Sequence, residues 1–395
     1  MLTRQFGQTS IAMPVLTCGG MRFQHSWDPS DQAPAENQAN LEATVRRALA
    51  LGINHIETAR GYGTSENQLG CILPKIPRHE FILQTKVAPT ADPADFERDF
   101  MDSLGRLKVP YVDLLALHGL NDDATLELAV RDGGCLERAL SLKQRGLVRG
   151  VGFSTHAPEP VILKAICDGR FEYVNLHYYW AYQQNLRAIR AAGARNMGIL
   201  IISPNDKGGR LYDPPEKLQR LTAPLSPMTY NDLFCLAQSE VSTLSIGVAK
   251  PSDFDEHVKA VTLFEQHEKD ARKLVGPIEA RLTAEYERVL GKAWATTWHE
   301  GLPEWHRVPG EVNVKEILRL YNLAKAFDLV AYGRMRYNLL ENGGHWFPGR
   351  SAANIDDAAL VSALQSSPHA ARLPEILRAA HQLLVGQKQK RLQQE

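Results

Sequence analysis

Short apolar runs alternate with longer segments in which apolar residues recur at helical spacing through the first two thirds of the chain. In residues 37–51, for example, Leu41, Val45, Ala48 and Leu49 form one stripe that ends before a glycine. The runs between such segments are short and apolar on both faces, which predicts buried strands. These predicted strands lie at 55–58, 81–86, 112–118, 148–154, 173–177, 198–203 and 243–247.

This alternation indicates a parallel sheet with helices on both faces. Its repetition over about 270 residues favours an eight-fold closed barrel over an open sheet. An open sheet that binds a dinucleotide usually carries a GxGxxG turn after its first strand, and residues 16–21, Leu-Thr-Cys-Gly-Gly-Met, do not match it. We therefore predict an α/β fold, a (β/α)8 TIM barrel.

The pattern changes after about residue 275. Helical periodicity continues at 278–290, 314–326 and 373–385, and no strand signal recurs. A chain of 395 residues is long enough for a large barrel with an appended region. The predicted domains are a barrel at 1–275 and a mainly helical C-terminal region at 276–395.

Polar side chains follow several of the predicted strands. Glu57, Lys86 and His118 each come at or near the end of an apolar run, and Tyr62 lies five residues after Glu57. Active residues of TIM barrels lie at the carboxyl ends of the strands, so we expect all four side chains at one rim. A tyrosine, a lysine, a carboxylate and a histidine together form a proton donor suited to carbonyl reduction.

Each of the four has a role in that chemistry. A tyrosine with its ordinary pKa of about 10 is a poor donor near neutral pH, and a neighbouring ammonium lowers this pKa. Lys86 is the candidate ammonium, and Glu57 is the anion that a buried lysine needs. His118 either hydrogen-bonds the substrate oxygen or relays a proton. Each residue taken singly also has an ordinary structural interpretation. His118 could be a structural histidine at a strand end, and Lys86 a charge at the rim. Glu57 could be a surface acid, and Tyr62 a loop anchor.

The composition limits which partners and which cellular compartment we expect for this protein. The chain is 44% hydrophobic and 23% charged, and its 45 basic and 45 acidic residues give no net charge, so we expect a globular protein without a nucleic-acid partner. The five cysteines have no CxxC spacing, which predicts a reducing, cytoplasmic location. We expect no membrane association, because no apolar run approaches the roughly 20 residues of a bilayer span and no signal peptide is visible.

The motifs of residues 3–265 resemble those of the aldo/keto reductases. The resemblance is carried by the opening residues 4–9, by Thr-Ala-Arg-Gly-Tyr-Gly-Thr-Ser-Glu at 58–66, and by the blocks at 145–156, 203–211 and 246–257. It implies an NADPH-dependent oxidoreductase that reduces an aldehyde or ketone to an alcohol. Tyr62 is then the proton donor, assisted by Glu57, Lys86 and His118, and NADH stays open as an alternative cofactor.

The resemblance also implies contacts to the nicotinamide end of the cofactor and to its pyrophosphate. Ser154, Thr155 and Asn175 match positions near the nicotinamide carboxamide. The loop at 203–211 matches the segment that covers the pyrophosphate. Its candidate contacts are Ser203, Lys207 and Gly208.

The block at 246–257 is similar to the family's adenosine-phosphate motif. In that reading Lys250 meets a 2′-phosphate, which favours NADPH over NADH, and Glu256 holds the adenine. The alternative is a strand, a turn and a helix capped by Ser252, with no ligand role for Lys250. His257 replaces an asparagine common in the motif, so we expect different adenine contacts.

Position 57 departs from the family pattern in a second way. The family normally has aspartate there, and Glu57 is one methylene longer. Glu57 can still pair with the Lys86 ammonium, but its carboxylate must approach in another rotamer. Displacements of about 1 Å at an active site can lower the rate substantially.

The C-terminal region resembles a helical extension that carries iron–sulfur clusters in one branch of the family. The expected ligand positions of the first cluster hold His299, Leu302, Trp305 and Val308, the segment of the second at 345–351 also lacks cysteine, and no cysteine follows Cys235. We therefore expect no iron–sulfur cluster. A zinc site at His299, His306 and His345 is disfavoured too, because their spacing matches no common zinc pattern.

The leading prediction is thus an NADPH-dependent reductase that acts on a small carbonyl substrate. The alternative is a nicotinamide-cofactor-binding regulatory or redox-assembly protein with little turnover, whose C-terminal region binds a protein partner. The sequence leaves open the physiological substrate, the oligomeric state and the role of the C-terminal region.

Overall fold

The computed structural model describes residues 1–267, 270–341 and 347–387. They form two compact units. The first contains Met1–Gly208 and Met228–Lys273, and the second contains Gly209–Pro227 together with the described part of Leu274–Glu395. The second unit therefore includes a segment that lies between two barrel strands in the sequence, whereas the domain boundary at 275/276 stays a prediction.

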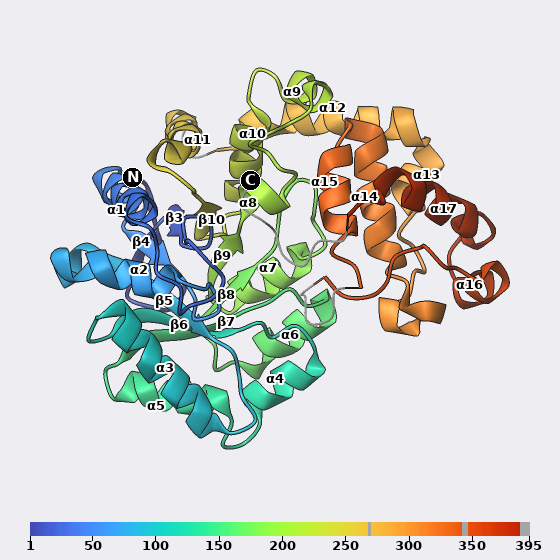
Figure 1. The fold of residues 1–395 in the computed structure, drawn as a ribbon. Helices are drawn as coiled ribbons and strands as arrows, with labels where there is room; N and C mark the ends of the chain where they lie inside the picture. Colours follow the sequence, from blue (N-terminus) through green and yellow to red (C-terminus); the bar gives the residue numbers. More distant parts are fainter. Residues whose placement is uncertain (268–269, 342–346, 388–395) are drawn as a thin grey trace. The chain divides into compact units, whose positions relative to one another are not determined.

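The first unit is a closed barrel of eight parallel strands, which confirms the predicted fold class (Figure 1). Neighbouring strands follow the order β10-β3-β4-β5-β6-β7-β8-β9. Their bounds are β3 Leu16–Gly19, β4 His55–Glu57, β5 Ile82–Val87, β6 Val112–His118, β7 Val148–Ser154, β8 Tyr173–Leu176, β9 Gly198–Ile202 and β10 Thr243–Gly247.

Helices surround these strands, as expected for a barrel (Figure 1). Helix α3 (Pro93–Leu107) shows how the sequence sets their ends. Asp92 caps it by accepting a hydrogen bond from the Ala94 N–H at 2.9 Å, and it ends at Lys108 in the left-handed conformation. The other barrel helices are α1 Ala35–Ala50, α2 Ser65–Ile72, α4 Asp123–Val130, α5 Cys135–Gln144, α6 Glu159–Asp168, α7 Leu186–Ala194, α8 Pro204–Lys207, α10 Pro227–Leu236 and α11 Phe254–Gln266.

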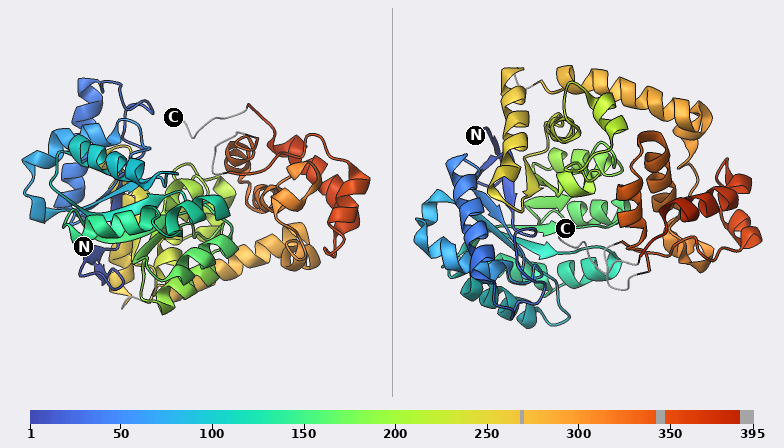
Figure 2. Two further views of the ribbon diagram at one scale, coloured as in Figure 1. Left: turned by 90° about the horizontal axis from the view of Figure 1, so that it is seen from below. Right: turned by 45° about the horizontal axis from the view of Figure 1, so that its top comes forward.

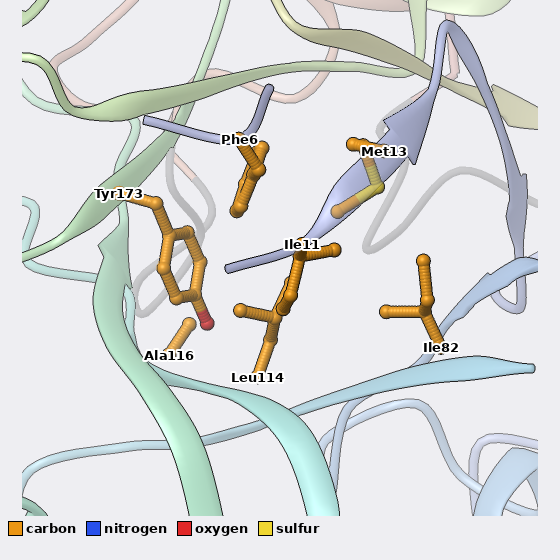
Figure 3. Close-up of a cluster of buried hydrophobic side chains, with 7 residues drawn as sticks. All are labelled: Phe6, Ile11, Met13, Ile82, Leu114, Ala116 and Tyr173. Carbon is orange, nitrogen blue, oxygen red and sulfur yellow. The ribbon is translucent and has the colours of Figure 1, made fainter. Parts of the chain in front are cut away.

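A hairpin closes the amino ends of the strands. It consists of β1 (Thr3–Gln5) and β2 (Ala12–Pro14). Figure 3 shows its apolar side chains packed against residues of β5, β6 and β8, in a cluster of Phe6, Ile11, Met13, Ile82, Leu114, Ala116 and Tyr173. Gly198 at the start of β9 is required here, since a Cβ would lie 2.8 Å from the Phe6 ring. With this end sealed, the carboxyl ends of the strands are left for chemistry.

The second unit is mainly helical, and the predicted helices at 278–290, 314–326 and 373–385 are present. Its helices are α9 Glu216–Thr222, α12 Arg272–Leu290, α13 Lys292–Thr297, α14 Val314–Phe327, α15 Val330–Tyr337, α16 Asp357–Ala363 and α17 Leu373–Leu384. Figure 2 shows α14, α15 and α17, in orange to red, as one group. Gly333 allows α15 to approach α17, because a Cβ there would lie 2.8 Å from a methyl carbon of Leu384.

The sequence pattern missed the short helices α13, α15 and α16. Each has at most eight residues, too few for a clear helical period. Among the described residues, the helices lack the combination of length and apolar character that crossing a membrane requires.

Candidate active site

The four candidate catalytic side chains come from three neighbouring strands and one loop. Glu57 ends β4, Lys86 is near the end of β5, His118 ends β6, and Tyr62 lies in the loop between β4 and α2. Because the strands are parallel and adjacent, their carboxyl ends lie at the same rim of the barrel.

Lys86 is the centre of this group. Its Nζ forms an ion pair with Glu57 Oε1 and donates hydrogen bonds to Tyr62 Oη at 3.0 Å and to the Thr58 carbonyl at 2.9 Å. The Tyr62 hydroxyl also lies 3.4 Å from Glu57 Oε1. Glu57 and Lys86 are only 2% and 1% exposed, so the ion pair is held out of water. The longer glutamate side chain therefore does reach the lysine.

A second bond fixes the Glu57 carboxylate. Ser245, on β10, donates its hydroxyl to Glu57 Oε2 at 2.9 Å. Each carboxylate oxygen thus has a partner, as a buried anion requires. The rotamer of Glu57 is consequently set from two sides.

The pKa values in this group differ from the expectation based on the sequence, which was wrong on one point. Burial of the phenol raises the pKa of Tyr62, whereas we had expected the Lys86 ammonium to lower it. Burial, together with the charge of Lys207, lowers the pKa of Lys86. The two groups, whose ordinary pKa values lie close together, are thus shifted in opposite directions.

His118 faces Tyr62 edge-on. The two ring centroids are 5.8 Å apart with an interplanar angle of 84°. Burial, followed by the charges of Lys86 and Lys207, lowers the pKa of His118 to about 3. The imidazole is therefore neutral near neutral pH, which favours hydrogen bonding to a substrate oxygen over a proton relay through imidazolium.

Asn175 is a buried amide whose side chain lacks hydrogen-bond partners in the described residues. Its side chain is 0% exposed, and neither amide atom has a hydrogen-bond partner within the described residues. Buried amides are nearly always bonded, so an unpartnered donor and acceptor point to a bound group that offers both. A carboxamide has this complementarity, and Asn175 therefore fits the nicotinamide end of the cofactor.

The two other residues expected near the carboxamide differ from each other. Ser154 is paired with Asn175 in the sheet register, and its Oγ accepts a bond from the Gly119 N–H at 3.2 Å. Thr155 instead anchors loops, because its hydroxyl donates to the Leu120 carbonyl at 2.7 Å and accepts from the Ala157 N–H at 2.9 Å. The cofactor contact of Thr155 stays a prediction that its present bonds do not favour.

The loop after β9 begins with an unusual backbone conformation. Ser203 adopts φ 48° and ψ 53°, a left-handed conformation uncommon for residues other than glycine. Gly208 ends the short helix α8, where a Cβ would lie 2.1 Å from the Pro204 carbonyl oxygen. The Lys207 side chain is buried, with Nζ 3.1 Å from His177 Nε2.

In the block after β10, Asp253 takes the capping role that one sequence reading gave to Ser252. Asp253, not Ser252, accepts the N–H bonds of Ala249 and Lys250, at 2.8 and 3.2 Å. Lys250 itself is exposed, so its ammonium is accessible to a ligand.

Two residues of the following helix α11 were also expected near the adenine. Glu256 is half-buried. His257 is buried and its Nδ1 lies 2.5 Å from Asp232 Oδ2 on α10. This bond joins α10 and α11, and the expected change in the adenine contacts stays a prediction.

The predicted cluster-ligand positions in the second unit hold ordinary side chains. Leu302 and Val308 are buried in apolar packing, whereas His299 is exposed. Among residues 1–267, 270–341 and 347–387, no three acidic, histidine or cysteine side chains are grouped as metal ligands would be. His345 lies outside the described residues, and the predicted absence of metal stays a prediction.

Sequence reasoning missed two polar clusters. One is the Asp232–His257 pair, and the other is a row of basic side chains formed by His156, His177 and Lys207. Neither has a sequence signal, because the partners come from separate elements and meet only in the closed barrel.

Comparison with known proteins places this geometry in a family. The family model described as aldo/keto reductase matches residues 15–210, which include all four candidate catalytic residues. L-galactose dehydrogenase of Arabidopsis thaliana is 26% identical over 329 residues, covering 76% of this chain and 97% of the plant protein. An uncharacterized oxidoreductase of Bacillus subtilis, YqkF, is 26% identical over 264 residues, covering 58% of this chain and 84% of the bacterial protein.

Solved structures agree at the level of the fold. The holo form of an aldo-keto reductase from Bacillus halodurans superimposes with a TM-score of 0.56 at 23% identity, covering 69% of this chain and 96% of that protein. The match to the family model, the names of the similar proteins and the closed barrel all agree. This chain belongs to the aldo/keto reductase superfamily and is an oxidoreductase of that superfamily.

Proposed function

We propose that this protein is an NADPH-dependent reductase that converts an aldehyde or ketone to an alcohol, with Tyr62 as the proton donor. The observation that carries the proposal is the position of Lys86 Nζ, which contacts both the Tyr62 hydroxyl and the Glu57 carboxylate. The reduced nicotinamide supplies the hydride when bound.

The opposite pKa shifts support a route by which Tyr62 regains its proton. Burial makes the phenol of Tyr62 a weaker acid and the ammonium of Lys86 a stronger one. After Tyr62 gives its proton to the substrate oxygen, the phenolate takes a proton from Lys86 across the 3.0 Å hydrogen bond. Glu57 keeps Lys86 protonated in the resting state, because an adjacent carboxylate favours the ammonium.

His118 positions the substrate. As a neutral imidazole it donates a hydrogen bond to the carbonyl oxygen, beside the Tyr62 hydroxyl that protonates the same atom. In the reverse direction the same residues accept the proton of an alcohol. That direction is consistent with the name of the Arabidopsis relative, L-galactose dehydrogenase.

The cofactor is held by residues at two strand ends, of β7 and β8, and by the two segments that follow β9 and β10. Asn175 and Ser154 bind the nicotinamide carboxamide, where the unpartnered amide of Asn175 offers both a donor and an acceptor. Thr155 is the third residue of this group. We assign Ser203 and Gly208 to the pyrophosphate, with Lys207 as a charge near that loop.

The adenosine end is assigned to the segment after β10. The exposed ammonium of Lys250 binds the 2′-phosphate, and Glu256 binds the adenine. A 2′-phosphate contact is the reason for preferring NADPH to NADH.

Tyr62→Phe tests the reaction. Purified protein is mixed with NADPH and a panel of aldehydes and ketones, and oxidation of NADPH is followed. We expect kcat to fall at least about 100-fold, because the variant keeps the ring but lacks the acidic proton. Turnover that stays at the wild-type level would overturn the mechanism.

Tyr111→Phe is the matched control. It removes one phenol hydroxyl from a ring at the opposite ends of the strands, where the Arg78 guanidinium lies 3.9 Å from the ring centroid. We expect turnover near the wild-type level in this variant. Binding of NADPH by Tyr62→Phe, measured by fluorescence quenching, separates a lost proton donor from a lost cofactor site.

A further inference from the structure

Three basic side chains form a row at the barrel rim beside the candidate catalytic residues. His156 follows β7, His177 follows β8 and Lys207 lies in α8 after β9, so they come from three neighbouring strand ends. His177 Nε2 lies 2.7 Å from His156 Nδ1 and 3.1 Å from Lys207 Nζ. We name these three residues the basic row.

The sheet register places this row one layer above the expected nicotinamide site. Side chains along a strand alternate, so Tyr173, Asn175 and His177 share the face of β8 that points into the barrel. Tyr173 belongs to the apolar cluster at the amino end, and Asn175 is the buried amide above it. His177 is the next inward position, at the mouth through which a substrate must enter.

The row is rich in hydrogen-bond donors. An ammonium can only donate, and an imidazole nitrogen has one lone pair or one proton. An oxyanion at this point would accept from several of these groups at once.

The charge of Lys207 also affects the candidate catalytic residues. It is one of the causes that lower the pKa of Lys86 and of His118. His177 and Lys207 are each 7% exposed, and the Tyr179 and Tyr182 rings lie 5.8 and 6.1 Å from the His177 ring. Burial among aromatic rings lowers the local dielectric, which strengthens attraction to an anion.

We propose that His156, His177 and Lys207 bind an acidic group of the substrate, so that the preferred substrates are carbonyl compounds bearing a carboxylate. The proposal rests on the proposed function, because it names the class of substrate for the same site.

The cofactor pyrophosphate is the other oxyanion that could meet Lys207. The direction of the Lys207 side chain favours a substrate carboxylate over the pyrophosphate as its partner. The Lys207 ammonium lies against His177, on the inward face of β8, and acts on the two catalytic neighbours of Tyr62. A side chain that served only the outer loop would not need to reach this layer.

Matched aldehydes test the proposal. We would measure kcat/KM with NADPH for 3- and 4-formylbenzoate and 4-oxobutanoate, and for the corresponding neutral amides. We expect the acid to exceed its amide at least about tenfold in the wild type, the gain typical of a charge-assisted contact. In Lys207→Met and His177→Gln the ratio of acid to amide should fall to near one, whatever the loss in overall rate.

Lys164→Met is the control for net charge. Lys164 is an exposed lysine on α6 that pairs with Asp123, and its removal should leave the ratio of acid to amide unchanged. Equal kcat/KM for acid and amide in the wild type would overturn the proposal. A ratio that survives in Lys207→Met would overturn it as well.

Two further measurements separate a substrate site from a pyrophosphate site and from a protein without turnover. If Lys207→Met weakens NADPH binding in a fluorescence titration but leaves the acid preference intact, the lysine serves the pyrophosphate and the proposal fails. If the wild type reduces none of these aldehydes, the proposed function fails. Calorimetric binding of 4-formylbenzoate and of its amide to the NADP⁺ complex then tests whether the basic row binds an acidic group. Tighter binding of the acid supports the row, and equal affinity overturns it.

Discussion

The two ends of the barrel are built from the same strands but from different chemistry. On β5, Ile82 lies in the apolar cluster at the amino end and Lys86 lies in the candidate active site. On β6, Leu114 and His118 divide in the same way. All four belong to strands whose side chains are almost entirely buried. Burial by itself therefore does not distinguish a residue that stabilises the fold from one that serves chemistry.

The difference lies in what burial costs at each end. At the amino end, removal of apolar area from water stabilises the fold. At the carboxyl end, a lysine–glutamate ion pair and an unpartnered amide are buried, and both are expensive to desolvate. One end thus provides stability, and the other retains polar groups that a reaction or a ligand would explain.

Breaking the ion pair should have the largest effect. Lys86→Met leaves the Glu57 carboxylate buried without its cation, and we expect a loss of about 3–5 kcal/mol in the free energy of unfolding. Turnover should fall at least about 100-fold as well, because Tyr62 loses its proton source. Urea unfolding and NADPH-linked turnover measure the two effects.

The double variant Glu57→Gln/Lys86→Met separates them. Neutralising both partners removes the isolated charge, so stability should recover most of the loss while turnover stays low. Recovery of turnover together with stability would show that the pair acts only in folding.

Truncating a side chain of the amino-end cluster should lower stability but leave turnover unchanged. Phe6→Ala removes a ring that is 0% exposed, and we expect a loss of about 3–5 kcal/mol of stability. Turnover per folded molecule should stay near the wild-type level, because the candidate site lies at the other strand ends. Met101→Ala, at a position 42% exposed, is the control and should change stability by less than about 0.5 kcal/mol. A large fall in turnover per folded molecule would contradict this division of the barrel.

The smallest effect is expected from Asn175→Leu. Replacing an unpartnered buried amide by an apolar group of similar shape should leave stability unchanged or raise it by about 1 kcal/mol. The dissociation constant for NADPH should rise about tenfold as the carboxamide loses its partner. Chemical denaturation and a fluorescence titration provide the two numbers.

Asn231→Leu is a matched comparison with the reverse outcome. Asn231 is equally buried, but its amide is bonded to the Trp180 N–H and to the Pro204 carbonyl, both at 3.2 Å. The same substitution there should destabilise the protein by about 1–3 kcal/mol. If the two variants behaved alike, the amide of Asn175 would not be the ligand-binding group that we infer.

Sequence reasoning reached the barrel because the strands are short and apolar along their whole length. It also selected Glu57, Lys86 and His118, since a polar residue at the end of such a run stands out from its neighbours. It failed on the sign of the Tyr62 pKa shift, which depends on the balance between a nearby charge and desolvation of the phenol. That balance is a property of the packed site.

The sequence by itself determined the order of strands and helices and the polar residues at the strand ends, because both are encoded in local periodicity. Only the tertiary structure decided that Ser245 fixes Glu57, that His257 pairs with Asp232, and that three basic side chains meet at the rim. These contacts join residues from separate elements, and the closure of the barrel, which no local pattern records, brings them together.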